Sequence, residues 1–258
     1  MFRLVKMSAD GSFTPTTISP KAAVKQDKSA AEALYQQLAE ALQNGTGPKK
    51  IKKAYGKKDS GKDRCFTPPY ATRLLFPFLP KGITIWEPAA GDGFIAWVLL
   101  EAGYKVIQTD ISRGFDFLKD KPDFHFDAII TNPPYQAQLK LGFIKRCYEY
   151  GVPWAMLMQD MTHRNKLPQE LFDHHGVEVI SSDERIDYFM PGQGYKTGGS
   201  NFKSLWYTHK FGLGKETTVV KLNKPKNANV VINEVEQLRT RYGTKVETFQ
   251  PVIQPVLF

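Results

Sequence analysis

Between residues 65 and 211, segments with strand character alternate with segments with helical character, and this alternation constrains the fold most strongly. Short apolar strands are predicted at 83–86, 105–110, 128–132, 153–159 and 176–182. Helices are predicted before the first strand, at 67–79, and between the later strands, at 94–103, 138–151 and 165–176. Such a strand–helix repeat predicts an α/β fold, a mostly parallel sheet with helices on its faces.

Two further strand-like runs, 185–190 and 201–211, flank a glycine-rich loop. They predict an antiparallel β-hairpin that closes a Rossmann-like sheet of seven strands. We therefore divide the chain into three parts. A basic N-terminal extension with one helix at 29–45 is expected over residues 1–64, a catalytic domain over 65–211, and a C-terminal extension or tail over 212–258.

Composition limits the classes of function. Of the 258 residues, 41% are hydrophobic, which is enough for a substantial core, and the net charge of +9 favours a polyanion such as nucleic acid as a partner. The two cysteines form no CxxC pair and the five histidines show no ligand spacing with them, so neither a disulfide framework nor a metal site is predicted. Because the sequence shows neither a secretory signal nor an apolar run of about 18 residues, we expect a cytoplasmic protein without a membrane span.

A glycine-containing turn follows the first predicted strand. Gly91 and Gly93 let a ligand approach the backbone beside the exposed amides of the next helix. Glu87 ends that strand, and Asp110 ends the next strand about 20 residues on, where a carboxylate can accept hydrogen bonds from ribose hydroxyls. With Ala96 at the third small position, the turn fits NAD as well as an adenosyl cofactor.

A second segment indicates which of these two cofactors is bound. It consists of Asn132, Pro133, Pro134 and Tyr135. It follows the strand predicted at 128–132, at the end where open α/β sheets place their active sites. An aromatic amino nitrogen is a poor nucleophile, and the Asn132 side-chain oxygen with the Pro133 carbonyl can each accept one of its N–H hydrogen bonds, which favours a pyramidal nitrogen. The two prolines stiffen the segment, and Tyr135 offers a ring for stacking on a base. This chemistry indicates methyl transfer to an amino group.

Three segments in this order resemble the gamma class of amino DNA methyltransferases. They are FTPPY at 66–70, EPAAGDGF at 87–94 and NPPY at 132–135, and the resemblance covers roughly residues 66–211. In that class the methionine-binding segment precedes the glycine turn, and the NPPY segment follows it. The resemblance implies a class I methyltransferase fold, S-adenosyl-L-methionine as cofactor, and transfer to the N6 amino group of adenine after base flipping.

The resemblance also implies cofactor contacts. Thr67 contacts the methionine carboxylate, and Glu87 or Asp110 contacts the ribose. Asp116, next to Phe117, accepts a hydrogen bond from the adenine amino group of the cofactor. The cofactor-binding positions in the turn are Pro88, Ala89, Gly91 and Gly93.

Two aromatic positions follow from the same resemblance. Phe202 pairs with Tyr135 around the flipped base, with Tyr195 and Trp206 as alternatives. Phe143 either packs on the adenine of the cofactor or belongs to the helix core.

Alternative functions remain open at this point. NPPY also occurs in methyltransferases of RNA amino groups and of release-factor glutamine, although a TPPY segment placed before the turn is not typical of those. A non-catalytic nucleic-acid-binding protein with a methyltransferase fold is the other alternative.

No segment of this sequence resembles the long C-terminal recognition domain of larger family members, and in this it is similar to small methyltransferases of phages and mobile elements. Sequence readout would therefore come from the loop at 192–200, the basic N-terminal region or a second subunit, or be relaxed. The last five residues, with Gln254, Leu257 and Phe258, resemble peptides that dock on the bacterial sliding clamp, and chance is the other explanation.

Overall fold

The computed structural model describes residues 4–7, 13–16, 65–190, 194–195, 197, 202–214 and 217–243. The chain divides into two compact units, Met1–Lys57 and Lys58–Phe258. In the first unit, β1 (Leu4–Met7) pairs with β2 (Phe13–Thr16) in an antiparallel ribbon. The predicted helix at 29–45 and the clamp-like tail lie outside the described residues, as does most of the loop at 192–200.

A seven-stranded sheet organises the second unit, in the order β11-β7-β10-β6-β5-β3-β4. Its strands are β3 (Thr84–Glu87), β4 (Lys105–Gln108), β5 (Ala128–Thr131), β6 (Trp154–Gln159), β7 (Glu178–Ser182), β10 (Ser204–His209) and β11 (Thr217–Val220). Only β10 runs antiparallel to its neighbours among these strands. The predicted mostly parallel, Rossmann-like sheet is confirmed.

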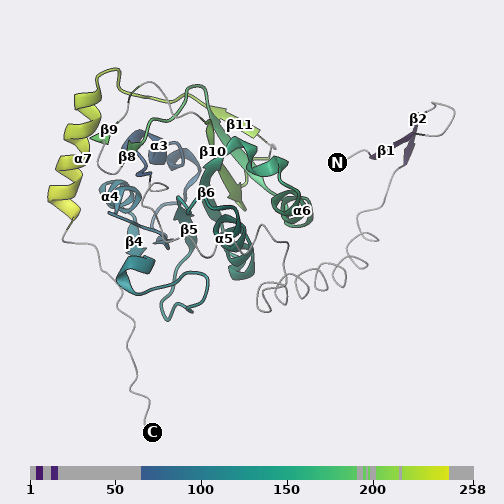
Figure 1. Ribbon diagram of the computed structural model, residues 1–258, viewed down its shortest axis with the longest axis horizontal. Helices are drawn as coiled ribbons and strands as arrows, with labels where there is room; N and C mark the ends of the chain where they lie inside the picture. Colours follow the sequence, from purple (N-terminus) through teal and green to yellow (C-terminus); the bar gives the residue numbers. More distant parts are fainter. Residues whose placement is uncertain are drawn as a thin grey trace, which may run out of the picture. The chain divides into compact units, whose positions relative to one another are not determined.

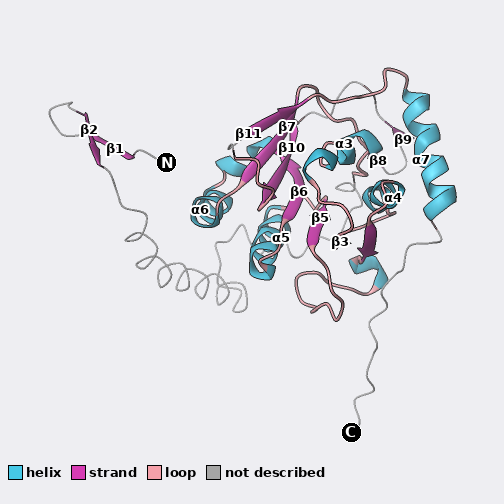
Figure 2. Ribbon diagram, turned by 180° about the vertical axis from the view of Figure 1, so that it is seen from behind, coloured by secondary structure: helices cyan, strands magenta, loops and turns pink. Residues whose placement is uncertain are grey.

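Helices cover both faces of the sheet (Figures 1 and 2). On one face lie α3 (Pro69–Arg73), α4 (Phe94–Glu101) and α7 (Ala228–Tyr242), and on the other lie α5 (Ala137–Tyr150) and α6 (Lys166–His175). The described residues also include three short 3₁₀ segments, η1 (Phe76–Phe78), η2 (Ile111–Arg113) and η3 (Asp160–Arg164). No helix in the described part of the chain is long and apolar enough to cross a membrane.

The apolar runs explain which elements lie in the centre. Every residue of β5 is buried, and so are the first five of β6, as expected for parallel strands covered on both faces. Helix α4 is apolar all round, with Ile95 to Leu99 buried, because α3 and α7 cover the side that faces away from the sheet. Below the carboxyl end of β3, the fully buried Trp86 packs against Phe115, Phe117, Phe124, Phe126 and Tyr150.

The predicted hairpin forms, but it is separate from the sheet. It consists of β8 (Phe189–Met190) and β9 (Gly194–Tyr195), whereas the run after the loop becomes β10 and inserts between β6 and β7. The run at 185–190 stays out of the sheet because its backbone N–H and C=O groups form hydrogen bonds with residues outside the sheet. The Tyr70 hydroxyl bonds both the N–H and the C=O of Asp187, and Phe66 bridges Phe189.

The C-terminal part contains two elements that the sequence analysis does not predict. Strand β11 supplies the seventh strand beside β7, and α7 packs on α4 and α3 through the buried Val231, Val235 and Leu238. Their spacing of four and three residues is typical of an amphipathic helix. Arg241 binds both carboxylate oxygens of Glu101 on α4, at 2.8 and 2.9 Å.

Candidate active site

A cavity of about 390 Å³ opens at the carboxyl ends of β3, β4 and β5. This is where open α/β sheets bind ligands, and the volume is typical of a small-molecule site. The residues predicted from the sequence that line it are Thr67, Glu87, Pro88, Ala89, Gly91, Asp110, Asp116, Phe117, Asn132, Pro133, Pro134, Tyr135 and Phe143. One cavity therefore unites the three segments on which the resemblance depends.

The glycine turn holds its shape through two left-handed backbone positions. Gly91 has a φ of 53° and Gly93 has a φ of 98°, backbone conformations that residues with a Cβ rarely adopt. A Cβ on Gly93 would meet Trp97 Nε1 at 2.8 Å, so this glycine is required by packing on α4. Gly93 is not among the lining residues of the cavity, unlike Gly91.

Asp110 fastens this turn to the end of β4. Its Oδ2 accepts a hydrogen bond from the Gly91 amide at 2.8 Å, and its Oδ1 accepts from the amide and hydroxyl of Ser112 at 2.9 and 2.6 Å. Burial opposes ionisation of this carboxyl, but the bonds from Ser112 and Gly91 outweigh it and lower the pKa of Asp110. Asp110 is therefore a fixed negative charge at the cavity wall.

Glu87 is a different kind of acid. It is 1% exposed, and its Oε1 accepts one bond from the Ala89 amide at 3.3 Å. Its Oε2 is buried with no hydrogen-bond partner among the described residues. Burial raises the pKa of Glu87 to about 8, so the side chain is mostly protonated at neutral pH. An uncommitted carboxyl oxygen thus lies beside the glycine turn.

The far wall of the cavity is aromatic. The rings of Phe117 and Phe143 lie with their centroids 4.6 Å apart, and both line the cavity. Asp116, next in the chain, accepts a bond from the Leu118 amide at 3.0 Å and pairs with Lys119 at 2.7 Å. A flat ring with an amino edge would meet an apolar surface and a carboxylate here.

Asn132 stands where β5 ends, and its amide group is fixed from one side. Its Nδ2 donates to the Cys65 carbonyl at 3.0 Å and to the Thr67 hydroxyl at 3.2 Å. Its Oδ1 is buried and has no hydrogen-bond partner in the described part of the chain. A buried carbonyl oxygen without a donor costs free energy, so this atom indicates a donor that comes with a ligand.

Tyr135 is held by residues from the C-terminal half of the sheet. Its ring meets Phe202 edge to face, with centroids 5.7 Å apart. Its hydroxyl donates to the Tyr188 hydroxyl at 3.5 Å, which in turn donates to Ser204 Oγ at 2.7 Å. Phe202 thus lies beside Tyr135, although it does not line the cavity.

The two alternatives to Phe202 lie elsewhere. Trp206 is fully buried and donates through Nε1 to the Ala71 carbonyl at 2.9 Å. The hydroxyls of Tyr195 and Tyr70 lie 3.0 Å apart, and the Tyr195 ring packs on Phe189. Of the three aromatic residues, only Phe202 has a recorded ring contact with Tyr135.

Sequence reasoning missed several lining residues, among them Cys65 and Phe66. The Phe66 ring stacks on Phe94 with centroids 5.0 Å apart and touches the space over Gly91. Their position one and two residues before Thr67 is the one signal that could have identified them. Ser112 had a weaker signal, since a serine two residues after an aspartate often bonds its side chain in a tight turn.

No family model matches the chain, and no curated protein sequence is similar to it. Among solved structures, the chain is similar to the candidate RNA methyltransferase PH1948 from Pyrococcus horikoshii, with 15% identity, a TM-score of 0.44, and coverage of 59% of this chain and 88% of that one. It is also similar to the M protein of the type I restriction enzyme EcoKI, with 12% identity, a TM-score of 0.42, and coverage of 64% and 50%.

A third similar structure is a TehB-like SAM-dependent methyltransferase from Corynebacterium glutamicum. The identity is 15%, the TM-score is 0.34, and the match covers 70% of this chain and 97% of that one. The chain spans about half the length of the EcoKI M protein and most of the length of the other two. At such values the chemistry of the cavity has to be inferred from its own residues.

Proposed function

We propose that this chain is an S-adenosyl-L-methionine-dependent methyltransferase that transfers a methyl group to N6 of adenine in DNA. The observation that supports this most directly is the buried, unpartnered Oδ1 of Asn132, beside Pro133 in the same cavity as the glycine turn. An amino group is the donor that such an oxygen lacks. A keto oxygen at that place would oppose acceptor to acceptor.

The cavity residues fit the proposed cofactor. Asp110 offers a charged acceptor to ribose hydroxyls, the carboxyl of Glu87 offers them a second hydrogen-bonding group, and Thr67 offers a hydroxyl to a carboxylate. Phe117 and Phe143 offer an apolar wall to an adenine ring. When bound, S-adenosyl-L-methionine supplies an electrophilic methyl group on a sulfonium.

The role of the chain is to hold the acceptor nitrogen. Asn132 Oδ1 and the Pro133 carbonyl accept from the two N–H groups, which draws the nitrogen lone pair out of conjugation with the ring. Tyr135 stacks on the base, with Phe202 at its edge. The rigid backbone of two prolines keeps these acceptors in place without reorganisation during the reaction.

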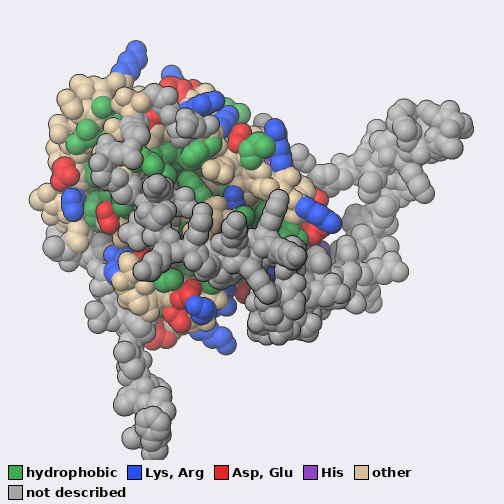
Figure 3. Space-filling model, in the orientation of Figure 1, with side chains coloured by type: hydrophobic (Ala, Val, Ile, Leu, Met, Phe, Trp, Pro, Cys, Tyr) green, Lys and Arg blue, Asp and Glu red, His purple; other side chains and the backbone are tan. Residues whose placement is uncertain are grey.

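The net charge of +9 supports a nucleic acid as the substrate. On the face seen in Figure 3, the lysine and arginine side chains of the described residues are scattered, with acidic side chains between them. We therefore assign most of the phosphate contact to parts of the chain other than this face, in line with the basic sequence at 48–64.

The test supplies methyl-labelled cofactor together with duplex DNA, total RNA or extracted protein in separate reactions. We expect label in DNA with the wild-type chain and almost none with Asn132→Ala. Asn165→Ala, at an exposed asparagine that bonds Met161, is the matched control and should retain full activity. Label found only in RNA or only in protein would contradict DNA as the substrate and would identify that molecule as the acceptor. Cofactor binding without label in any acceptor would indicate a non-catalytic protein.

A further inference from the structure

The orientation of the Asn132 amide is decided by its neighbours at Cys65 and Thr67. The acceptor at 3.0 Å is the Cys65 main-chain carbonyl, which has lone pairs and no proton. Only the NH₂ end of the amide can therefore face it. The opposite end, Oδ1, is turned away from residues 65–67 and is the buried atom without a partner.

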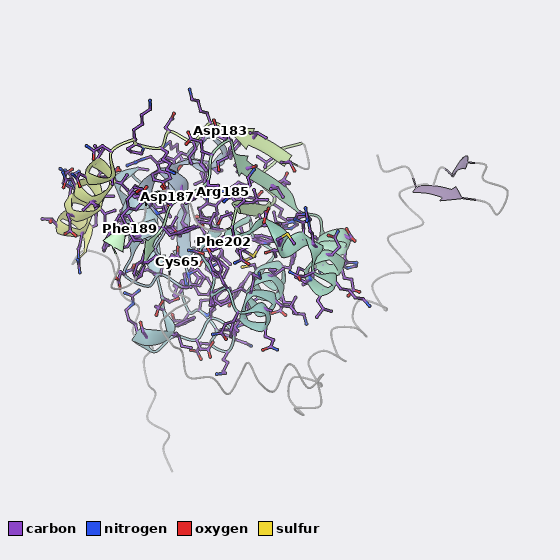
Figure 4. All side chains as sticks on the ribbon, turned by 45° about the horizontal axis from the view of Figure 1, so that its top comes forward. Cys65, Asp183, Arg185, Asp187, Phe189 and Phe202 are labelled. Carbon is purple, nitrogen blue, oxygen red and sulfur yellow. The ribbon has the colours of Figure 1, made fainter. Side chains whose placement is uncertain are left out.

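The Cys65 carbonyl is itself held in place. The neighbouring residue Phe66 forms a two-bond antiparallel bridge with Phe189, its N–H donating to the Phe189 carbonyl at 2.9 Å and its own carbonyl accepting at 3.2 Å. Cys65 Sγ also contacts Met190 Sδ at 3.5 Å. Figure 4 shows Cys65 and Phe189 labelled near one another in the body of the molecule. Strand β8 thus fixes the backbone that fixes Asn132.

Thr67 is the second acceptor, and it differs from the carbonyl because it also has a proton to donate. It is 2% exposed, and its Oγ1 accepts from Asn132 Nδ2 at 3.2 Å. No hydrogen bond donated by this hydroxyl is recorded among the described residues. The same hydroxyl can therefore accept from Asn132 and donate to a carboxylate in the cavity.

We propose that Thr67, together with the Cys65 carbonyl, is a positioning residue that sets the polarity of Asn132 and so restricts the acceptor substrate to groups that donate a hydrogen bond. This inference rests on the proposed function for its substrate, but the orientation of the amide does not depend on it. Exocyclic amino groups satisfy the rule. Keto groups at the same ring position, as in guanine or thymine, do not.

The test compares Thr67→Val, Thr67→Ser and Thr72→Val in the full-length chain. Valine removes the hydroxyl at constant shape, and serine keeps it. Thr72 is the matched control, because it is fully buried nearby on α3 and its hydroxyl has no partner in the part of the chain that the structure describes. In ¹⁵N-labelled protein, the side-chain NH₂ signals of Asn132 are assigned by their loss in Asn132→Asp.

We expect one Asn132 amide proton to shift and to exchange faster in Thr67→Val, and neither to change in Thr72→Val. The kcat with saturating cofactor and DNA should fall about tenfold in Thr67→Val, as for the loss of one hydrogen bond. Thr67→Ser should stay within about threefold of the wild type. Affinity for S-adenosylhomocysteine, measured separately, reports any contact of Thr67 with the cofactor.

Unchanged Asn132 amide signals in Thr67→Val would overturn the inference, and so would a raised KM for the cofactor with an unchanged kcat. If Thr67→Val does not fold, amide-proton exchange in the wild-type protein tests the inference instead. Its Asn132 amide protons must exchange more slowly than those of the exposed Asn165, and equal rates would contradict the orientation. Shifted amide signals in a chain that never methylates adenine would refute the proposed function alone.

Discussion

The two sides of the cavity hold their polar groups by different means. On the side of the glycine turn, Asp110 receives its hydrogen bonds from Gly91 and Ser112, which belong to the turn and to its own loop. On the opposite side, Asn132 is held by Cys65 and Thr67, which are 67 and 65 residues away in the sequence. Tyr135 likewise contacts Tyr188, 53 residues later in the chain.

Because of this difference, substitutions on the two sides of the cavity should impair different properties. The glycine turn forms from neighbouring strand ends, so damage to it should weaken cofactor affinity and stability. The Asn132 side leaves one acceptor uncommitted and keeps it in place through distant segments. Damage there should reduce turnover while cofactor binding persists. Substitutions on each side of the cavity should therefore have distinct effects, the largest of them at Asn132.

Asn132→Ala should lower kcat by about 10²–10³-fold, because it removes the preorganised acceptor that we propose for the reacting nitrogen. Affinity for S-adenosylhomocysteine, measured by titration calorimetry, should stay within about threefold of the wild type. A variant that lost both properties together would show that the two sides of the cavity are not separable.

Asp110→Ala should have the opposite profile. We expect cofactor affinity to fall about tenfold or more, and the free energy of unfolding to fall by about 2 kcal/mol, since three donors lose a charged acceptor. Urea unfolding and calorimetry measure both quantities. Asp123→Ala, at an exposed aspartate, is the control and should change neither.

Glu87 should make the stability of the cofactor-free protein depend on pH. Its folded-state pKa is about 8 against an ordinary value of 4.5, so the folded chain retains a proton that the unfolded chain releases between these values. Its contribution to stability is therefore complete below pH 4.5 and is lost as pH rises toward 8. The slope is at most about 1.4 kcal/mol per pH unit.

Urea unfolding at several pH values, with Glu87→Gln as the comparison, isolates this slope from other titrating groups. The variant should lose less stability than the wild type between pH 5 and pH 8. Parallel curves for the two proteins would mean that Glu87 is ionised in the folded state, like Asp110.

Tyr188→Phe should have the smallest effect, a reduction in kcat of about two- to fivefold with unchanged cofactor affinity. Its hydroxyl joins Tyr135 to Ser204, and the contact with Tyr135 is long at 3.5 Å. A loss as large as that of Asn132→Ala would place Tyr188 among the groups that touch the substrate.

The same contrast explains what sequence could predict. The glycine turn, Asp110 and the NPPY segment are local patterns of residue type, and the structure places them just after β3, β4 and β5. The groups that orient Asn132 could not be found this way, because a main-chain carbonyl such as that of Cys65 has no residue-type signature. The exclusion of residues 185–190 from the sheet could not be found this way either, because it involves long-range contacts of Phe66 and Tyr70 with residues 187–189.

The position of the transferred methyl group tests the central claim most directly. Duplex DNA is incubated with the full-length chain and cofactor, digested to nucleosides and analysed by mass spectrometry against standards. We expect N6-methyldeoxyadenosine from the wild type, formed about 10²–10³-fold more slowly by Asn132→Ala. Methylation at a ring carbon, or at a ring nitrogen of any base, would contradict an asparagine oxygen and a proline carbonyl acting on an exocyclic amino group.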